Sequence, residues 1–277
     1  MPGAGLTAAE CARYRRDGFV FPVAALRASE VAAARAWLDA FDRRHAALPK
    51  KERRDSMLRF KPHLLHPALD AIVRHPRILD AIERLIGPDI LVWASAFFIK
   101  DARDRSFVSW HQDSVTYGLQ GDDLVSAWIA LNDVDAGNAS MRFLPGSHRG
   151  GLVHHRLATD ADNMVSLGET IDGIDAARSV SVELRAGEMS LHNIHLMHAS
   201  EANASDRARI GFVIRYFPPA MRAQGGPASA LLVRGEDRHG NFELERPPLA
   251  ADDPATIARH ARALELRKAR VFAAVAS

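Results

Sequence analysis

The stretch from Ser109 to Asp113 constrains the fold most strongly, because it places an imidazole and a carboxylate two residues apart. In an extended strand the side chains of residues i and i+2 leave the same face. His111 and Asp113 can therefore offer one nitrogen and one oxygen to a single metal ion. A second histidine from a distant strand would complete a 2-His-1-carboxylate ligand set, which leaves open positions on an octahedral Fe(II) ion. A fold that uses this pair must bring another strand against it.

Taken alone, this spacing carries little weight. A chain of 277 residues with 13 histidines contains about one or two His-x-Asp or His-x-Glu matches by chance, and His111 provides the one match here. The alternative is a solvated histidine near a solvated aspartate. The rest of the chain has to decide between the two.

Composition places the chain among ordinary globular proteins. It is 47% hydrophobic and 25% charged, so its length provides ample material for a core. The net charge of +2 comes without a block of lysine or arginine, which argues against nucleic acid as a partner. Cys11 is the single cysteine, which excludes an internal disulfide. Without a long apolar run or a signal-peptide pattern, we expect a cytoplasmic protein with no membrane partner.

Hydrophobic patterning predicts helices at both ends of the chain and strands between them. Thr7 and Glu10 form a capping-box pattern that opens the first helix, and Pro22 indicates that the first strand lies at a sheet edge. Helices are expected over residues 7–16, 29–47, 68–74, 76–86 and 253–271. Strands are expected over residues 18–23, 90–99, 108–112, 124–131, 140–144, 179–184, 189–191 and 209–217. Residues 61–67 show no regular pattern. Short strands at this spacing are typical of a barrel or sandwich with helices outside.

The segment 191–200 contains three histidines that compete for the distal ligand position: His192, His195 and His198. In one ideal strand, His192 and His198 would share a face and His195 would point the opposite way. Other histidines are expected in turns or in solvent: His148, His154 and His155.

Arg209 follows His198 by eleven residues and opens an apolar strand. A dicarboxylate such as 2-oxoglutarate would chelate iron through its 2-oxo acid end, and its far carboxylate would need a rigid, bidentate cation. A guanidinium on a neighbouring strand provides such a cation. Arg207 and Arg215 compete with Arg209, although Arg215 lies about 20 Å along the strand.

Four segments carry a wider pattern: Trp110–Asp113, Val125–Trp128, Phe143–His148, and His198–Ser200 together with Arg209. In this order they resemble the phytanoyl-CoA dioxygenase family, whose members are Fe(II)- and 2-oxoglutarate-dependent oxygenases built on a double-stranded β-helix. The resemblance covers about residues 7 to 250. One departure is Ala199, where the family usually has glycine.

The resemblance implies that His111, Asp113 and His198 are the iron ligands and that Arg209 binds 2-oxoglutarate. The other candidates are Trp128, Ser200, Gln112 and Lys100 at the cosubstrate, and Tyr117 and Lys61 at the substrate.

The implied fold is mainly β with flanking helices, in one oxygenase domain over residues 1–277. Its parts are a helical region 1–88, a jelly-roll or cupin-like double-stranded β-helix over about 89–220, and a C-terminal extension and helix 221–277. The implied cofactors are Fe(II), 2-oxoglutarate as cosubstrate and O2. We expect hydroxylation of an unactivated C–H bond of a small-molecule metabolite, with release of succinate and CO2. Desaturation, epoxidation or cyclisation on the same iron stays open, as does a non-catalytic cupin-like binding module or a zinc-dependent hydrolase or isomerase.

Overall fold

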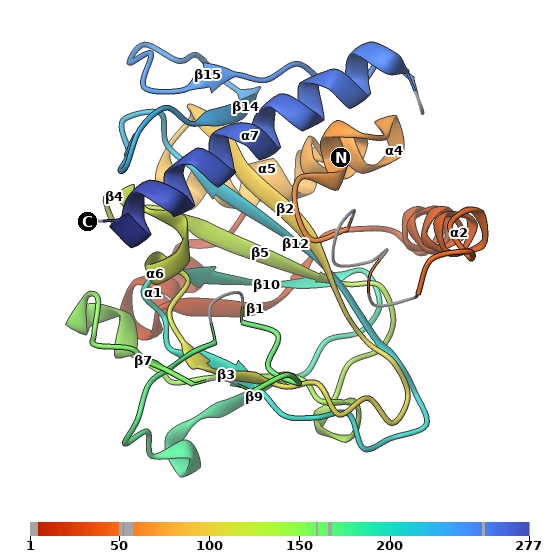
Figure 1. The fold of residues 1–277 in the computed structure, drawn as a ribbon. Coiled ribbons are helices and arrows are strands. Elements are labelled where there is room, and N and C mark those ends of the chain that lie inside the picture. Colours follow the sequence, from red (N-terminus) through yellow and green to blue (C-terminus); the bar gives the residue numbers. More distant parts are fainter. Residues whose placement is uncertain are drawn as a thin grey trace.

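Two antiparallel sheets that face each other form the centre of the protein (Figure 1). The computed structural model describes residues 5–49, 52, 58–158, 160–165, 168–250 and 253–276. The larger sheet has seven strands in the order β1, β10, β5, β12, β2, β14 and β15. Their bounds are Phe19–Ala24, Glu188–Asn193, Val125–Ala130, Arg209–Phe217, Ile90–Lys100, Ser229–Arg234 and Glu243–Leu244, respectively. All neighbours pair antiparallel except β14 and β15, which are parallel.

The smaller sheet has four strands in the order β3, β11, β6 and β9. Their bounds are Val108–His111, His198–Ser200, Met141–Phe143 and Val180–Val182. Two short pairs lie beside the sheets, β4 (Leu119–Gln120) with β13 (Arg222–Ala223) and β7 (Arg156–Leu157) with β8 (Glu169–Thr170). The predicted mainly β fold with flanking helices and a double-stranded β-helix core is confirmed.

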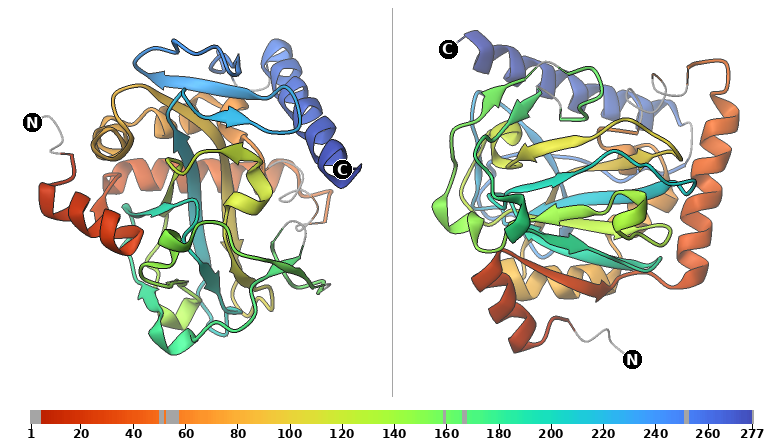
Figure 2. Two further views of the ribbon diagram at one scale, coloured as in Figure 1. Left: turned by 90° about the vertical axis from the view of Figure 1, so that its left-hand side faces the viewer. Right: turned by 90° about the horizontal axis from the view of Figure 1, so that it is seen from below.

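The helices lie outside the two sheets (Figures 1 and 2). The α-helices are α1 (Ala8–Asp17), α2 (Ala28–Arg44), α4 (Pro67–Val73), α5 (Pro76–Ile86), α6 (Ser114–Tyr117) and α7 (Pro254–Ala276). The 3-10 helices are η1 (Pro62–Leu64), η2 (Ala136–Asn138), η3 (Ser147–Gly150) and η4 (Ala176–Arg178). The helices α1 and α7 lie on opposite sides of the sheets (Figure 2). None of the helices in the described ranges is long and apolar enough to cross a membrane.

Alternation along the central strands separates a helix-facing core from an interior polar face. On β12 the side chains of Phe212, Ile214 and Tyr216 pack in the same core cluster as residues of α1, α2, α4 and α5. Arg209 and Arg215 belong to the other set of alternate positions and line the cavity between the sheets. Successive side chains of a strand point to opposite faces, so one strand serves both the core and the cavity.

Most predicted elements are present at nearly the predicted positions. The Thr7 hydroxyl accepts a hydrogen bond from the Glu10 amide at 3.2 Å, and the Glu10 carboxylate accepts one from the Thr7 amide at 2.8 Å, so the capping box is confirmed. The strand that contains Pro22 lies at the edge of the larger sheet, as predicted. One expectation was wrong, because η1 occupies part of 61–67, where no regular structure was expected. The segment 191–200, whose face assignment was left open, is divided between β10 and β11. The sequence did not predict the short strands β4, β7, β8, β11, β13 and β15, the six-residue β14 or the short helix α6.

The hydroxyl of Tyr216 connects the larger sheet to the helical layer, because it donates a hydrogen bond to the buried carbonyl of Val73 at 2.9 Å. Tyr216→Phe removes the donor and leaves the carbonyl without it. We expect a loss of about 1–3 kcal/mol in the free energy of unfolding, measured by urea denaturation. An unchanged urea midpoint would show that the bond contributes nothing.

Candidate metal centre and cavity

Strand pairing brings two of the predicted ligands together. His198 on β11 lies directly opposite His111 on β3, and the centroids of the two imidazole rings are 4.1 Å apart. Asp113 follows β3 in a helical backbone conformation (φ −60°, ψ −27°), so a turn, and not a continued strand, directs its carboxylate towards His111. One potential ligand atom of each residue lies within 4.8 Å of the others, and all three residues are buried. This arrangement can hold one metal ion.

Both histidines are held in the same orientation by their own backbone. The Nδ1 of His111 lies 2.9 Å from the carbonyl oxygen of Ser109, and the Nδ1 of His198 lies 2.9 Å from that of Leu196. A ring nitrogen that donates to a carbonyl carries the proton, so the lone pair is on Nε2 in each ring. Each Nε2 atom can therefore donate its lone pair to a metal ion.

Asp113 is held through one of its two oxygens. Its Oδ2 accepts a hydrogen bond from the Ser126 hydroxyl at 2.8 Å and lies 3.8 Å from Nε2 of His192. Its Oδ1 lies 3.9 Å from Nε2 of His111. Burial by itself would raise the pKa of Asp113, but the contact with His192 and the charge of Arg215 outweigh burial and hold this pKa well below its usual value. The carboxylate is therefore ionised and presents Oδ1 to the centre.

Burial keeps the two opposed histidines neutral. It lowers the pKa of both His111 and His198 to about 4, and for His111 the neighbouring His198 adds to the effect. Metal binding requires the neutral imidazole. At neutral pH the site therefore has two neutral nitrogen ligands and one anionic oxygen ligand.

The other two histidines of segment 191–200 have different positions. His192 is buried at the cavity wall, and its ring centroid lies 5.0 Å from that of His198. His195 instead bonds Ser114 Oγ at 3.1 Å and Asp122 Oδ1 at 2.9 Å. The group that could hold a metal ion therefore includes His198, while Nε2 of His192 lies 3.8 Å from Oδ2 of Asp113.

Arg209 is buried and lines the cavity, and it pairs across the sheet with Lys100. One terminal nitrogen of its guanidinium donates to the Ala139 carbonyl at 2.6 Å, and its Nε is buried with no hydrogen-bond partner among the described residues. The Trp128 ring centroid lies 5.7 Å from the Arg209 Cζ. Burial lowers the pKa of Arg209 to about 10, so the group remains charged at neutral pH. The cavity wall at Arg209 is therefore suited to an anion.

A glycine permits this packing. A Cβ atom built on Gly211 would lie 2.0 Å from Cζ2 of Trp128, closer than real Cβ atoms approach. Gly211 occurs on β12 between the cavity-facing residues Arg209 and Val213. The missing side chain thus lets the indole lie against the strand beside Arg209.

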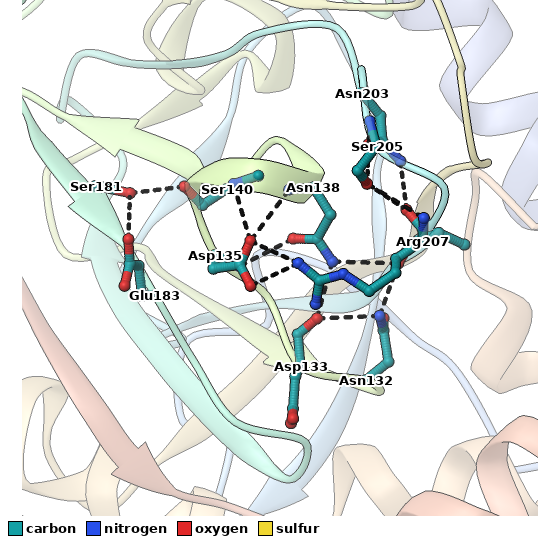
Figure 3. Close-up of polar contacts among 12 residues, drawn as sticks. Asn132, Asp133, Asp135, Asn138, Ser140, Ser181, Glu183, Asn203, Ser205 and Arg207 are labelled. Carbon is teal, nitrogen blue, oxygen red and sulfur yellow. Dashed lines mark hydrogen bonds and ion pairs between the residues drawn. The ribbon is translucent and has the colours of Figure 1, made fainter.

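Arg207, the rival of Arg209, has a structural role (Figure 3). One of its terminal nitrogens lies 2.9 Å and 2.7 Å from the two carboxylate oxygens of Asp135. Asn132 bonds both sides of the start of β12, donating to the Ala208 carbonyl at 2.7 Å and accepting from the Ile210 amide at 2.8 Å. These contacts connect the segment before β12 to the 132–139 loop, which supplies the carbonyl that Arg209 bonds.

The cavity has a volume of about 600 Å³ and includes most of the predicted site residues. Its lining contains the following predicted residues: His111, Asp113, His198, Arg209, Trp128, Ser200 and Lys61. Lys100 lies behind the wall, where its Nζ donates to the Ser200 hydroxyl at 2.8 Å and to the Glu201 carbonyl. Burial and the charge of Arg209 lower the pKa of Lys100 to about 6.

Gln112, a predicted cosubstrate neighbour, is not among the residues that line the cavity. Its Nε2 donates to the carbonyls of Gly151 and His195, both at 2.7 Å, and its Oε1 accepts from the Val153 amide at 2.9 Å. The amide nitrogen and oxygen of its side chain are therefore both hydrogen-bonded to the backbone of neighbouring loops. His155, expected in solvent, is half-buried and accepts from the Gln112 amide at 3.0 Å. The side chain of Tyr117 lies outside the described part of the structure.

Several residues near the centre were not predicted from the sequence. Ser126 lies in the Val125–Trp128 segment, which resembles the family pattern, but no role was predicted for it. Arg215 was considered only as an alternative to Arg209. His192 was considered only as a rival ligand. No sequence signal marked Arg59 or Phe98, which also line the cavity.

The comparisons with known proteins agree with this geometry. The family model described as phytanoyl-CoA dioxygenase (PhyH) matches residues 14–211. A probable alpha-ketoglutarate-dependent hypophosphite dioxygenase of Stutzerimonas stutzeri is 28% identical over 66% of this chain, and an ectoine dioxygenase of Halomonas elongata is 28% identical over 74%. The matches span 61% and 68% of these relatives. A solved structure of the non-heme monooxygenase ThoJ in its apo form is 38% identical, with a TM-score of 0.85 over 96% of this chain and 98% of ThoJ.

The lowered pKa values of His111 and His198 predict acid sensitivity of the metal-free protein. An unfolded histidine has a pKa of about 6.5, so below that pH the unfolded chain binds protons that the folded protein excludes. Stability is therefore fully present above about pH 6.5 and is lost as the pH falls towards 4, by up to about 1.4 kcal/mol per pH unit for each group. Urea denaturation in the presence of a chelator at pH 7.5 and pH 5 measures this loss. Equal free energies of unfolding at the two pH values would contradict it.

Proposed function

Because the chain belongs to the phytanoyl-CoA dioxygenase (PhyH) family, we propose that it is an Fe(II)- and 2-oxoglutarate-dependent dioxygenase. In this proposal it hydroxylates an unactivated C–H bond of a small-molecule metabolite and releases succinate and CO2. The observation that carries the proposal is the presence of the His111, Asp113 and His198 cluster and of Arg209 in one cavity.

The donor set fits the metal. Two neutral imidazole nitrogens and one carboxylate oxygen form the ligand set of non-heme Fe(II) oxygenases, with open positions for other ligands. When bound, iron together with 2-oxoglutarate and O2 supplies the oxidising power, which no side chain of the protein possesses. Ser109 and Leu196 orient the two imidazoles through their carbonyls, while Ser126 and His192 restrain the carboxylate.

The cavity wall at Arg209 fits the far carboxylate of 2-oxoglutarate. The buried Nε of Arg209, which has no partner among the described residues, is a donor that a carboxylate would satisfy. Ser200 is the second donor. Its oxygen accepts a hydrogen bond from Lys100, so its own hydroxyl hydrogen can be donated to an anion. Lys100 is therefore a positioning residue for Ser200. The Trp128 ring forms the apolar wall beside Arg209.

The Arg209 assignment predicts a selective loss of cosubstrate affinity. Arg209→Ala removes the buried cation, so we expect its dissociation constant for 2-oxoglutarate to rise by at least about thirtyfold. Calorimetric titration of the Mn(II)-loaded protein under anaerobic conditions measures it. Arg105→Ala, at a highly exposed arginine, is the matched control and should bind 2-oxoglutarate like the unchanged protein. If the Arg209 variant bound 2-oxoglutarate as tightly as the unchanged protein, Arg209 would not be part of the 2-oxoglutarate site.

The ligand assignment predicts loss of turnover. His111→Ala and Asp113→Ala should each lower succinate formation from 2-oxoglutarate, Fe(II) and O2 by at least about a hundredfold, because each removes a metal ligand. His154→Ala changes an exposed histidine and should turn over normally. Product analysis by mass spectrometry distinguishes hydroxylation, which adds one oxygen, from desaturation, which removes two hydrogens. Undiminished succinate formation in both ligand variants would end the proposal.

A further inference from the structure

Lys100 is a completely buried lysine that bonds no carboxylate. It ends β2 and is 0% exposed. Its Nζ contacts three neutral oxygens: the carbonyl of Ser200 at 3.1 Å, the hydroxyl of Ser200 at 2.8 Å and the carbonyl of Glu201. A buried ammonium ion is costly unless an anion compensates it. The protonation of Lys100 therefore depends on which other charges lie close to it.

A second buried cation lies opposite Lys100 in the larger sheet. Its partner in the pairing of β12 with β2 is Arg209, which is 1% exposed. The carboxylates of Asp104 and Glu201 act in the opposite sense, but Asp104 bonds the amides of residues 101 and 106, and Glu201 is exposed. Burial and the charge of Arg209 outweigh both carboxylates and lower the pKa of Lys100 to about 6. Without a further anion, Lys100 is therefore mostly neutral at pH 7.

The hydrogen bonds of Nζ depend on this protonation. An ammonium group has three N–H donors, one for each of the three oxygens, and it then donates to the Ser200 hydroxyl oxygen. A neutral amine has two N–H donors and one lone pair. It can serve both carbonyls only if its lone pair accepts the hydroxyl hydrogen of Ser200, because a carbonyl cannot donate. Protonation of Lys100 therefore frees the Ser200 hydroxyl to donate to a ligand.

The cosubstrate would supply the anion that Lys100 lacks. Arg209 and Ser200, which form the proposed site for the far carboxylate of 2-oxoglutarate, both line the cavity. A carboxylate oxygen bonded to the Ser200 hydroxyl would lie within about 6 Å of the Lys100 Nζ, because one oxygen atom connects the two hydrogen bonds. At that distance an anion favours the charged form of a lysine, and it also compensates Arg209. Both effects raise the pKa of Lys100.

We propose that binding of 2-oxoglutarate is coupled to the uptake of a proton, which passes from solvent to the Nζ of Lys100 and frees the Ser200 hydroxyl to donate to the cosubstrate. This inference rests on the proposed function, because it requires 2-oxoglutarate beside Arg209. Lys100 is not among the residues that line the cavity, so it acts through Ser200. The affinity for 2-oxoglutarate then falls as the pH rises above about 6, because the proton that binding requires becomes scarcer.

Calorimetry of the full chain, loaded with Mn(II) under anaerobic conditions, measures the proton uptake. 2-Oxoglutarate is titrated at pH 7.0 in buffers of different ionisation enthalpy, and the slope of binding enthalpy against ionisation enthalpy gives the number of protons. Carboxyl groups have pKa values of about 4, so 2-oxoglutarate itself takes up none. We expect at least about half a proton per cosubstrate, since a nearby anion raises a lysine pKa by about one to three units. A slope of zero would overturn the proposal.

The dissociation constant gives an independent reading. With metal saturation verified at each pH, it should rise at least about fivefold between pH 6 and pH 8. The reason is that the free protein loses the Lys100 proton near pH 6, whereas the bound protein retains it to a higher pH. The same dissociation constant at both pH values would contradict the coupling.

Two variants assign the proton to Lys100. Lys100→Met removes the titrating group, so its binding should show no proton uptake and should be weaker than that of the unchanged protein at pH 6. Lys100→Arg carries a permanent charge and should also bind without proton uptake. Lys268→Met, at an exposed lysine of α7, is the matched control and should keep the full uptake. Proton uptake that persists in a folded Lys100 variant would overturn the assignment.

The outcomes separate this proposal from the proposed function. A protein that binds 2-oxoglutarate without proton uptake keeps the oxygenase assignment and loses the coupling, and Lys100 then only holds Ser200 and the Glu201 carbonyl in place. The buffer series on the unchanged protein decides this point even where a variant fails to fold. A protein that fails to bind 2-oxoglutarate at all contradicts the proposed function itself.

Discussion

The pairing of β11 with β3 is the constraint on which the rest of the site depends. It sets His198 opposite His111, and the turn after β3 then brings in Asp113. A slip of one residue in this pairing would direct His198 to the opposite face, because strand side chains alternate with a period of two. The backbone carbonyls that accept from the two Nδ1 atoms belong to the same segments, so each histidine strand also orients its own ring.

The larger sheet makes such a polar interior possible, because its helix-facing positions carry the apolar core. Interior charges remain costly, and the protein offsets the cost locally: the Lys61 ammonium has a carboxylate partner. Lys100 is instead held by three oxygen acceptors, and burial lowers its pKa. Arg209 is compensated less completely, since its Nε has no partner among the described residues. A cavity organised in this way favours an anionic ligand beside Arg209. The proposed cosubstrate would occupy this place.

Sequence reasoning predicted the elements well and the long-range contacts only in part. Capping boxes, strand alternation and helix stripes are local signals, so the first helix, β12 and the helix after Asp253 were predictable. The division of segment 191–200 between two sheets was not, because its histidines fit one continuous strand equally well. The contacts of Gln112 were not predictable either: its neighbours are metal-ligand candidates, but its own side chain bonds the backbone of residues 151 and 153.

The central claim is that His111, Asp113 and His198 bind one divalent metal ion through Nε2, Oδ1 and Nε2. The most direct test is a crystal structure of the full chain with Mn(II), with the metal located by anomalous scattering. The account predicts one strong peak about 2.0–2.3 Å from each of these three atoms, with Asp113 Oδ2 still bonded to Ser126. A peak held by His192 in place of His198, or no peak between the two sheets, would contradict it.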